Sequence, residues 1–320
     1  MKITCDFCWR LCALSEGQTG VCSVRQNQGG RVVTLTRGRV VALAVDKVEK
    51  KPLSHFYPGH RTLSFALFGC NFSCSFCQNY TISQQEFFTE REGTVMEPAE
   101  LVRVALTHNT PSISFTYSEP LVWQDYLADV ARLAKEAGLL TIMVTNGSFS
   151  ETSIARLIPL IDAFNVDLKG DEAFYRQVCH GSAEPVLASI AAIAESGRHL
   201  EVTTMVCQKH HTPAVMETLA SELLERGVQV WHLSRYFPHY QSHEEATSEQ
   251  YLAQMIEIAR QKGIRHVYPG NSSLDSTTYC PECHSPLIIR RGMQGPQSTP
   301  LLQNGICQRC SAPLYGHFPA

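Results

Sequence analysis

The residues of this sequence with the clearest chemical character lie in segment 69–79, which reads GCNFSCSFCQN. It places thiols at Cys70, Cys74 and Cys77, a C-x3-C-x2-C spacing that a tight loop can gather on one face. Thiolates are the usual ligands of iron–sulfur clusters, and a [4Fe–4S] cube normally takes four of them. Because this segment supplies only three, the simplest interpretation is a cube with one iron open to a non-protein ligand. An open position is how a metal site does chemistry.

The alternatives for this triplet are a zinc knuckle and a disulfide loop. Zinc prefers four ligands in paired C-x2-C units, and no fourth cysteine stands close to the triplet in the sequence. Eleven of the thirteen cysteines fall into three clusters. In a long α/β chain such clusters indicate metal sites rather than a disulfide framework. Reduced thiols imply a reducing compartment, so we expect a cytoplasmic protein.

With an aromatic residue, Phe76, before the last cysteine, the triplet resembles the signature of the radical S-adenosylmethionine (SAM) enzymes. The resemblance implies that Cys70, Cys74 and Cys77 hold a catalytic [4Fe–4S] cluster whose open iron chelates the amino and carboxylate groups of SAM. One electron then splits the sulfonium into methionine and a 5′-deoxyadenosyl radical, which abstracts a hydrogen atom from a substrate. Such a cluster works at low potential, which implies a flavodoxin or ferredoxin as electron donor. Phe76 is expected among the cofactor-binding residues.

A second motif that resembles this family reads Tyr117-Ser118-Glu119-Pro120. The family has Gly-Gly-Glu-Pro here, a turn that holds the amino group of SAM. Tyr and Ser replace the two glycines, but Ser118 still permits close approach and Glu119 supplies a carboxylate. The alternative is an ordinary solvated glutamate at a strand end.

Three further strand ends carry polar residues that the resemblance places near SAM. Asp167 and Lys169 are two apart on a strand, so they face the same way, and they resemble the Asp-x-Lys pair of glycyl-radical-enzyme activases. A surface ion pair is the alternative. Asn146, in Thr-Asn-Gly, resembles a motif of the same activases, although Asn-Gly is also an ordinary turn. Thr203 is a candidate for the ribose, with burial in a strand as the alternative.

Two more cysteine sets flank the central part of the chain. The first has the spacing C-x2-C-x3-C-x9-C and the second C-x2-C-x23-C-x2-C; they comprise Cys5, Cys8, Cys12, Cys22 and Cys280, Cys283, Cys307, Cys310. Four thiolates from the first set fit either zinc or a second iron–sulfur cluster, and the spacing does not choose between them. A structural metal is favoured, and free thiols in a loop are the alternative. The paired knuckles of the second set are typical of a zinc ribbon, with zinc favoured over iron.

Between these sets, strand and helix patterns alternate every 25 to 35 residues from about residue 63 to residue 268. This rhythm predicts right-handed βαβ units, and six of them fit the partial (βα)6 barrel that the resemblance implies. We expect a Cys-rich module with a β-hairpin at residues 1–50, the hairpin falling within 31–45. The barrel follows at 51–275 and a zinc-ribbon-like module at 276–320. Residues 46–60 are expected to form a solvated connector, with Lys50, Lys51 or His55 at the mouth of the active site as the alternative. Residues 290–300 are expected to form a flexible loop.

The branch that the chain resembles is the AmmeMemoRadiSam-system radical SAM enzyme, related to the pyruvate formate-lyase activating enzyme. The texts EKKPLSHFYPG, GCNFSCSFCQNYTIS and FTYSEP carry this resemblance. It predicts a radical SAM enzyme acting on an unidentified substrate, which could be a protein. The alternative is an activase that installs a glycyl radical on a partner enzyme.

Composition argues against several other classes. Net charge is −3 and no basic run stands out, which counts against RNA or DNA as a partner. No apolar stretch is long enough to span a membrane, and the first residues show no secretory signal. A non-catalytic metal- or partner-binding protein is disfavoured because the cluster cysteines, Glu119 and Asp167 occur together.

Overall fold

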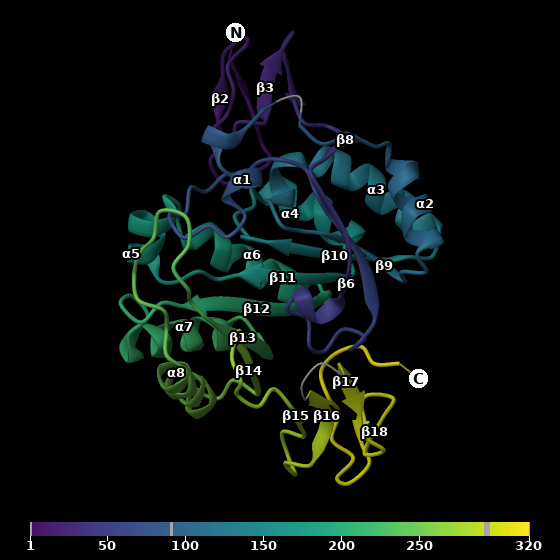
Figure 1. Ribbon diagram of the computed structural model, residues 1–320, viewed down its shortest axis with the longest axis vertical. Helices are drawn as coiled ribbons and strands as arrows, with labels where there is room; N and C mark the ends of the chain where they lie inside the picture. Colours follow the sequence, from purple (N-terminus) through teal and green to yellow (C-terminus); the bar gives the residue numbers. More distant parts are fainter. Residues whose placement is uncertain (1, 90–91, 291–294, 320) are drawn as a thin grey trace.

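The computed structural model describes residues 2–89, 92–290 and 295–319. Its centre is an eight-stranded sheet in the order β14-β13-β12-β11-β10-β9-β7-β6, in which β6 pairs antiparallel with β7 and every other pairing is parallel (Figure 1). The two end strands are β14 and β6, so the sheet is an open, partial barrel. The strands are β6 Ala42–Lys47, β7 Arg61–Ala66, β9 Ser112–Phe115, β10 Leu140–Thr145, β11 Ala163–Asp167, β12 His199–Val206, β13 Val230–Arg235 and β14 His266–Gly270.

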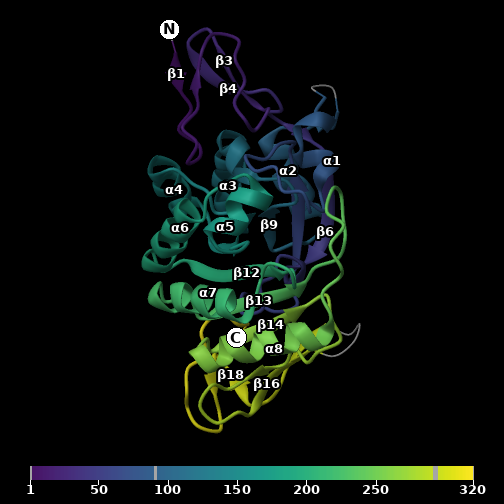
Figure 2. The same cartoon turned by 90° about the vertical axis from the view of Figure 1, so that its left-hand side faces the viewer.

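Helices follow the parallel strands and cover the outer face of the sheet (Figure 2). Short polar caps define several of them: Ser150 and Ser153 form a capping box at the start of α4, and Gly263 ends α8 in the left-handed conformation. The helices are α1 Tyr80–Ser83, α2 Pro98–Thr107, α3 Gln124–Glu136, α4 Glu151–Leu157, α5 Glu172–Phe174, α6 Glu184–Glu195, α7 Pro213–Glu225 and α8 Glu249–Lys262. The predicted barrel is confirmed, and no helix among the described residues is both long and apolar enough to cross a membrane.

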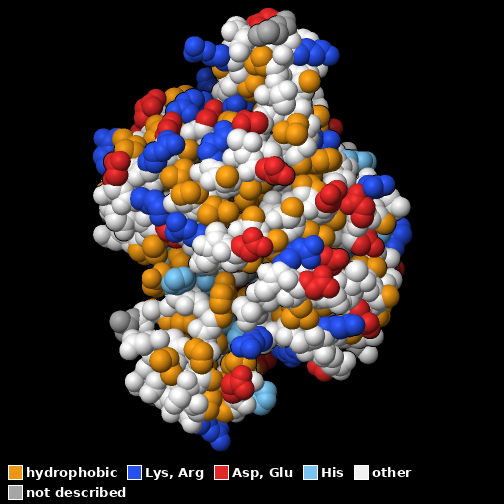
Figure 3. Space-filling view, turned by 180° about the vertical axis from the view of Figure 1, so that it is seen from behind, with side chains coloured by type: hydrophobic (Ala, Val, Ile, Leu, Met, Phe, Trp, Pro, Cys, Tyr) orange, Lys and Arg blue, Asp and Glu red, His pale blue; other side chains and the backbone are white. Residues whose placement is uncertain are grey.

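The two cysteine modules protrude at opposite ends of the long axis of the molecule (Figures 1 and 2). On the face in Figure 3 they form separate lobes, with basic and acidic side chains interspersed between them. Their strands are short: β1 Ile3–Thr4, β2 Ala13–Leu14, β3 Arg25–Gln28 and β4 Arg31–Thr34 in the first, β15 Thr278–Tyr279, β16 Pro286–Arg290, β17 Pro296–Ser298, β18 Leu302–Gln303 and β19 Ile306–Cys307 in the second. A further pair, β5 Arg39–Val40 and β8 Thr94–Val95, lies beside the sheet.

The predicted hairpin within residues 31–45 is wrong. Strand β4 pairs backward with β3, whereas β6 joins the central sheet and pairs with β7 along its whole length. The alternating pattern was real, but each strand finds its partner outside the segment. The proposed domain limits stay a prediction, although β6 contributes residues before 50 to the barrel sheet. The loop expected at 290–300 is also partly wrong, because β17 is a strand; residues 291–294 lie outside the described part.

The solvated connector expected at 46–60 is confirmed for Lys47 and Lys50, which are exposed, and is wrong for Lys51 and His55. Lys51 is 1 % exposed and its Nζ lies 2.9 Å from Asp46 Oδ2, an ion pair that no local pattern indicated. His55 is fully buried at the N-terminal end of the strands, where its Nδ1 lies 2.6 Å from the Tyr315 carbonyl oxygen. The connector therefore runs through the inside of the partial barrel rather than over its surface.

A buried carboxylate organises this end of the barrel. Glu201 in β12 accepts hydrogen bonds from His199 Nε2 at 2.9 Å and His232 Nε2 at 2.6 Å. It also accepts the backbone N–H groups of Ser54 at 2.8 Å and His55 at 2.7 Å. Burial alone would raise the pKa of Glu201, but the two histidines outweigh burial and hold its pKa well below the usual range.

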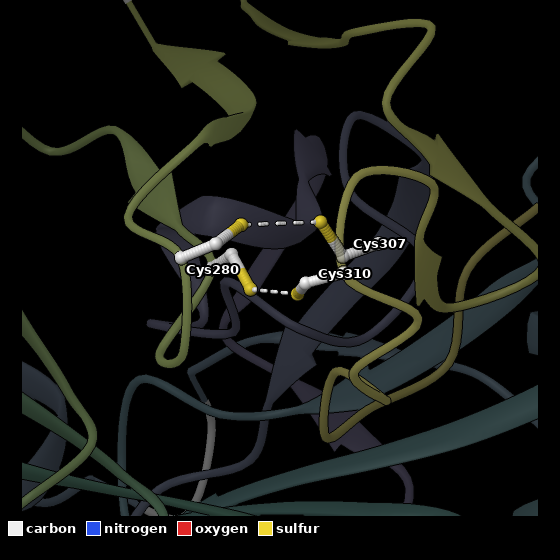
Figure 4. Close-up of side chains that lie close together, drawn as sticks. Cys280, Cys307 and Cys310 are labelled. Atoms are coloured by element: carbon white, nitrogen blue, oxygen red, sulfur yellow. Dashed lines mark hydrogen bonds between the residues drawn. The ribbon is translucent and has the colours of Figure 1, made fainter.

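The C-terminal module covers this end of the barrel. The Tyr315 hydroxyl accepts the N–H of Leu200, and His317 exchanges backbone hydrogen bonds with His55 and Tyr57. Within the module, Cys280 and Cys310 have their sulfurs 3.5 Å apart (Figure 4). The Cys283 and Cys307 sulfurs are 3.7 Å apart, and all four lie within 4.8 Å of one another. Four sulfurs at about 2.3 Å from one tetrahedral ion would stand close to these separations. This set could hold a single metal ion, as the ribbon prediction required.

Histidine burial at this end predicts a pH dependence of stability. Burial lowers the pKa of His266, which stands at the start of β14, from 6.5 to about 4. Between these pH values the unfolded chain binds a proton at this ring and the folded chain does not. The contribution of the neutral His266 ring to the free energy of unfolding is therefore fully present above pH 6.5. It is lost as pH falls toward 4, which lowers the free energy of unfolding by on the order of 3 kcal/mol.

We expect His266→Phe to remove this part of the pH dependence. Urea unfolding at pH values from neutral down to about 4, the folded-state pKa of His266, measures this. The free energy of unfolding of wild type should fall more steeply with falling pH than that of the variant. His108→Phe is the control, because it replaces an exposed histidine that stays in solvent in both states. Parallel pH profiles for wild type and His266→Phe would contradict the assignment.

Candidate active site

The three cysteines of the central motif lie on the loop that leaves β7 at its C-terminal end. Such loops carry the sites of α/β barrels, because the carboxyl ends of parallel strands meet at one edge. Cys74 is buried, while Cys70 and Cys77 are partly exposed, so one side of the group is open. Burial raises the pKa of Cys70, and the neighbouring Glu119, Cys74 and Cys77 raise it further. As thiolates these sulfurs would repel one another, and a cationic cluster would relieve that repulsion.

Polar groups around the sulfurs suit thiolate ligands. The backbone N–H of Phe72 donates to Cys70 Sγ at 3.4 Å, and Asn146 Nδ2 donates to the same sulfur at 3.8 Å. Ser83 Oγ lies 3.1 Å from Cys77 Sγ. Hydrogen bonds to sulfur are one of the means by which a protein tunes an iron–sulfur cluster. The donor set therefore fits an iron–sulfur centre with three protein ligands.

Glu119 is the most constrained acid of the site. Its Oε1 accepts from Thr145 Oγ1 at 2.6 Å and from the N–H of Leu121 at 3.0 Å, and its Oε2 accepts the N–H of Asn146 at 2.7 Å. Burial raises its pKa to about 7, and these hydrogen bonds partly offset the shift. The carboxylate thereby joins the ends of β9 and β10. Its predicted contact with SAM stays a prediction.

Asp167 and Lys169 do face the site together, as their spacing on the strand indicated. Lys169 Nζ lies 2.9 Å from Asp167 Oδ2, and the lysine side chain is only 17 % exposed. Burial opposes its charge, but Asp167, Cys74 and Cys179 outweigh burial and raise the pKa of Lys169. A permanent cation therefore stands beside the cysteine loop.

Cys179, which lies outside the three cysteine clusters, is buried but does not stand apart from the site. Its thiol hydrogen-bonds Cys74, and its carbonyl oxygen accepts the N–H of Ser73 at 3.2 Å. Since Cys179 is fully buried, it lies behind the loop, away from the open side at Cys70 and Cys77. No sequence signal linked it to the motif, because a long stretch of chain separates it from Cys74.

The other predicted cofactor residues have structural partners. Ser118 Oγ donates to the Leu67 carbonyl oxygen and accepts from Trp123 Nε1, so its hydroxyl is engaged within the protein. Thr203 pairs with the Asn165 side chain, with its Oγ1 2.9 Å from Asn165 Nδ2. Phe76 packs against Phe174 at a centroid distance of 5.8 Å. Roles for Ser118, Thr203, Phe76 and Asn146 in binding SAM stay predictions.

Sequence reasoning missed one polar group inside the barrel. Tyr117 adopts φ +67°, and its hydroxyl donates to Asp46 Oδ2 at 2.6 Å. Lys51 lies over the same ring at 4.3 Å from its centroid. The departure from glycine at this position therefore has a structural consequence, because only a side chain here can reach the Asp46–Lys51 pair. Asn79, at the end of the cysteine loop, donates to the Tyr117 carbonyl oxygen at 2.8 Å.

Comparison with known proteins agrees with this geometry. The family model described as the radical SAM superfamily matches residues 66–223. The uncharacterized protein MJ0808 of Methanocaldococcus jannaschii is 36% identical over 90% of this chain and 88% of its own. A 7-carboxy-7-deazaguanine synthase of Methanothermobacter thermautotrophicus is 30% identical over 41% of this chain and 51% of its own. Protein MJ1227 of M. jannaschii, described as a putative glycyl-radical enzyme activating enzyme, is 27% identical over 50% of this chain and 65% of its own.

Solved structures share the fold. The structure of Streptococcus suis SuiB bound to S-adenosylmethionine aligns with a TM-score of 0.53 and 13% identity, over 71% of this chain and 53% of that one. This chain thus spans about half the length of that protein and of the deazaguanine synthase. Family model, fold and cysteine loop agree, and the chain belongs to the radical SAM superfamily.

Proposed function

We propose that this protein reductively cleaves SAM at a [4Fe–4S] cluster held by Cys70, Cys74 and Cys77 and uses the resulting 5′-deoxyadenosyl radical to abstract a hydrogen atom from a substrate. The observation that carries the proposal is a three-thiol loop with one open side, placed at the carboxyl edge of a parallel sheet. When bound, the cluster supplies the electron that SAM cleavage requires.

The surrounding residues have separable tasks in this proposal. Glu119 fixes the relative positions of the β9 and β10 ends, so that Asn146 can donate to Cys70 Sγ. Lys169 keeps a positive charge near the buried Cys74, which offsets the anionic charge of thiolate ligands. Asp167 holds the Lys169 ammonium in place and retains a carboxylate oxygen, Oδ1, for an incoming cofactor. A flavodoxin or ferredoxin is the proposed electron donor.

An activase that generates a glycyl radical on a partner protein is a second candidate for the reaction. It is favoured by the Asp167–Lys169 pair, whose spacing is that of the activases, and by the partial similarity to MJ1227. Electron paramagnetic resonance of a mixture with a glycyl-radical enzyme, SAM and reductant distinguishes the two candidates. A protein radical on the partner supports the activase, whereas 5′-deoxyadenosine without a protein radical supports another substrate.

We propose that the C-terminal module holds zinc as a structural ion. The support is its four compactly spaced cysteines and the contacts by which the module covers the barrel end. Electron transfer at this module is disfavoured, because it lies at the far end of the molecule from the N-terminal cysteines, which contact the cluster loop (Figure 1).

The thiol assignment predicts opposite results for two neighbouring cysteines. Cys74→Ala should abolish binding of the [4Fe–4S] cluster that has one open iron, called the open cluster below, because two thiolates cannot hold the cube. It should also abolish 5′-deoxyadenosine formation with dithionite. Cys179→Ala is the matched control, because it removes a thiol that contacts Cys74. This variant should keep both the open cluster and 5′-deoxyadenosine formation. Cluster iron, acid-labile sulfide and 5′-deoxyadenosine measure the result. Full activity in Cys74→Ala, or loss of the cluster in Cys179→Ala, would contradict a three-cysteine site.

The turn into the loop predicts a second result. Gly69 has φ +119°, and a Cβ there would lie 2.8 Å from a Val24 methyl and 3.1 Å from Val122. Gly69→Ala should therefore displace the loop and lower its cluster content. Gly138→Ala also places alanine at positive φ, but with nothing within 4 Å, and should cost only about 1 kcal/mol. Equal iron content in the two variants would show that the loop tolerates displacement.

The zinc proposal is tested with Cys307→Ser. Elemental analysis should show loss of zinc, and hydrogen exchange should speed up at the Tyr57 and His317 amides, which bond across to the module. Cys207→Ser, which changes a buried cysteine outside the three clusters, should leave both unchanged. Iron in place of zinc, or zinc retained in Cys307→Ser, would refute the proposal.

A further inference from the structure

The N-terminal module packs on the loop after β10 and on the loop that carries Cys70, Cys74 and Cys77. Cys8 forms a β-bridge with Phe149, and the N–H of Trp9 donates to the Ser148 carbonyl oxygen at 3.1 Å. Arg10 Nε donates to the Asn71 carbonyl oxygen at 2.9 Å. The module therefore has no linker between itself and the candidate active site.

One side chain links the two cysteine sets. Asn71 follows Cys70 in the chain, is 1 % exposed, and its side chain lies near enough to the Cys8 thiol to lower the pKa of that thiol. Asn71 Oδ1 also accepts from Asn146 Nδ2 at 2.8 Å, and Asn146 Nδ2 in turn reaches Cys70 Sγ. The path from Cys8 to Cys70 thus crosses only Asn71 along the chain, and crosses the side chains of Asn71 and Asn146 through hydrogen bonds.

The N-terminal sulfurs are near one another but more widely spaced than those of the C-terminal module. Cys8 interacts electrostatically with Cys5, Cys12 and Cys22, which places the four in one group. Among the described residues, only the C-terminal module has three or more ligand atoms all within 4.8 Å. Neither the N-terminal sulfurs nor those of Cys70, Cys74 and Cys77 meet this 4.8 Å limit. Sulfurs around one ion must be close together, whereas sulfurs on the corners of a cube stand farther apart.

The N-terminal group has a buried side and an outer side. Cys5, Cys8 and Cys22 are at most 8 % exposed, and Asn71 contacts the group from the barrel. On the other side Leu11 is 50 % exposed and Val21 is 55 % exposed, next in sequence to Cys12 and Cys22. A group with one face at the surface and the other at the cluster loop is suited to pass charge inward.

We infer that Cys5, Cys8, Cys12 and Cys22 hold a second [4Fe–4S] cluster that relays electrons to the cluster on Cys70, Cys74 and Cys77 across the Asn71 contact. This inference rests on the proposed function for its purpose. One electron passes from a reduced low-potential donor of the flavodoxin or ferredoxin class to the N-terminal cluster, which goes from the 2+ to the 1+ state. It then moves to the open cluster, which becomes 1+ as the first returns to 2+. No proton or bond is exchanged in either step.

The identity of the centre is tested without SAM. A Cys70→Ser, Cys74→Ser, Cys77→Ser variant, purified and reconstituted anaerobically, should keep about four irons and four acid-labile sulfides per chain. A Cys5→Ser, Cys22→Ser variant should lose the same amount from the wild-type total, which covers the case in which the triple variant fails to fold. The C-terminal module does not change the number of acid-labile sulfides, because a single metal ion brings no sulfide. Zinc without sulfide at the N-terminal site would overturn the inference.

The contact is tested by electron paramagnetic resonance of the dithionite-reduced proteins. Wild type should show the broadened spectrum of two interacting spins, and Cys5→Ser, Cys22→Ser should show one narrow, uncoupled signal. In stopped-flow reduction by a reduced flavodoxin, this variant should lose the fast phase of open-cluster reduction, while reduction by dithionite persists. Uncoupled signals in wild type, or an unchanged fast phase, would overturn the relay. Two coupled clusters without SAM cleavage would instead count against the proposed function alone.

Discussion

The structure depends on the cost of holding three thiols, of which Cys74 is buried and Cys70 and Cys77 are partly buried, beside the carboxyl group of Glu119. The Cys179 thiol and burial raise the pKa of Cys74, burial raises the pKa of Cys70 and Cys77, and Glu119 raises the pKa of Cys70 further. As free thiols the three residues gain little from being close together, and as thiolates they repel one another. A cationic cluster removes both costs at once. The loop, the two strand ends joined by Glu119 and the Lys169 cation are all arranged around this requirement.

The rest of the fold can be understood as support for the open edge of the sheet. At the opposite strand ends, Glu201 joins β12 to β13 and to the buried connector, and the C-terminal module covers the group. The N-terminal module packs on the loop after β10 through Cys8 and Trp9, and on the loop of the three cluster cysteines through Arg10. The two outer cysteine sets therefore differ in position: one adjoins the chemistry, and the other closes the far end of the barrel.

The sequence predicted the elements whose signals are local. The C-x3-C-x2-C motif, the strand–helix rhythm and the paired cysteine knuckles each lie within a short segment, and the structure has the barrel and the compact four-cysteine group they indicated. Asp167 is the last residue of β11 and Lys169 lies just beyond the strand, where it still pairs with Asp167 as the two-residue spacing indicated. What the sequence could not predict are contacts between distant segments. The pairing of β6 with β7, the ion pair of Asp46 with the buried Lys51 and the contact of Cys179 with Cys74 all depend on how the chain returns in space. Asn71 likewise looks like a spacer within the motif and is a bridge in the structure.

The central claim is that one iron of the Cys70, Cys74 and Cys77 cluster is open to SAM. Electron–nuclear double resonance of the reduced, reconstituted protein with SAM labelled with ¹⁵N at its amino group and ¹⁷O at its carboxylate tests this most directly. The account predicts hyperfine coupling from both labels, because both groups would bind the open iron. A cluster signal that shows no coupling to either label at saturating SAM would contradict it.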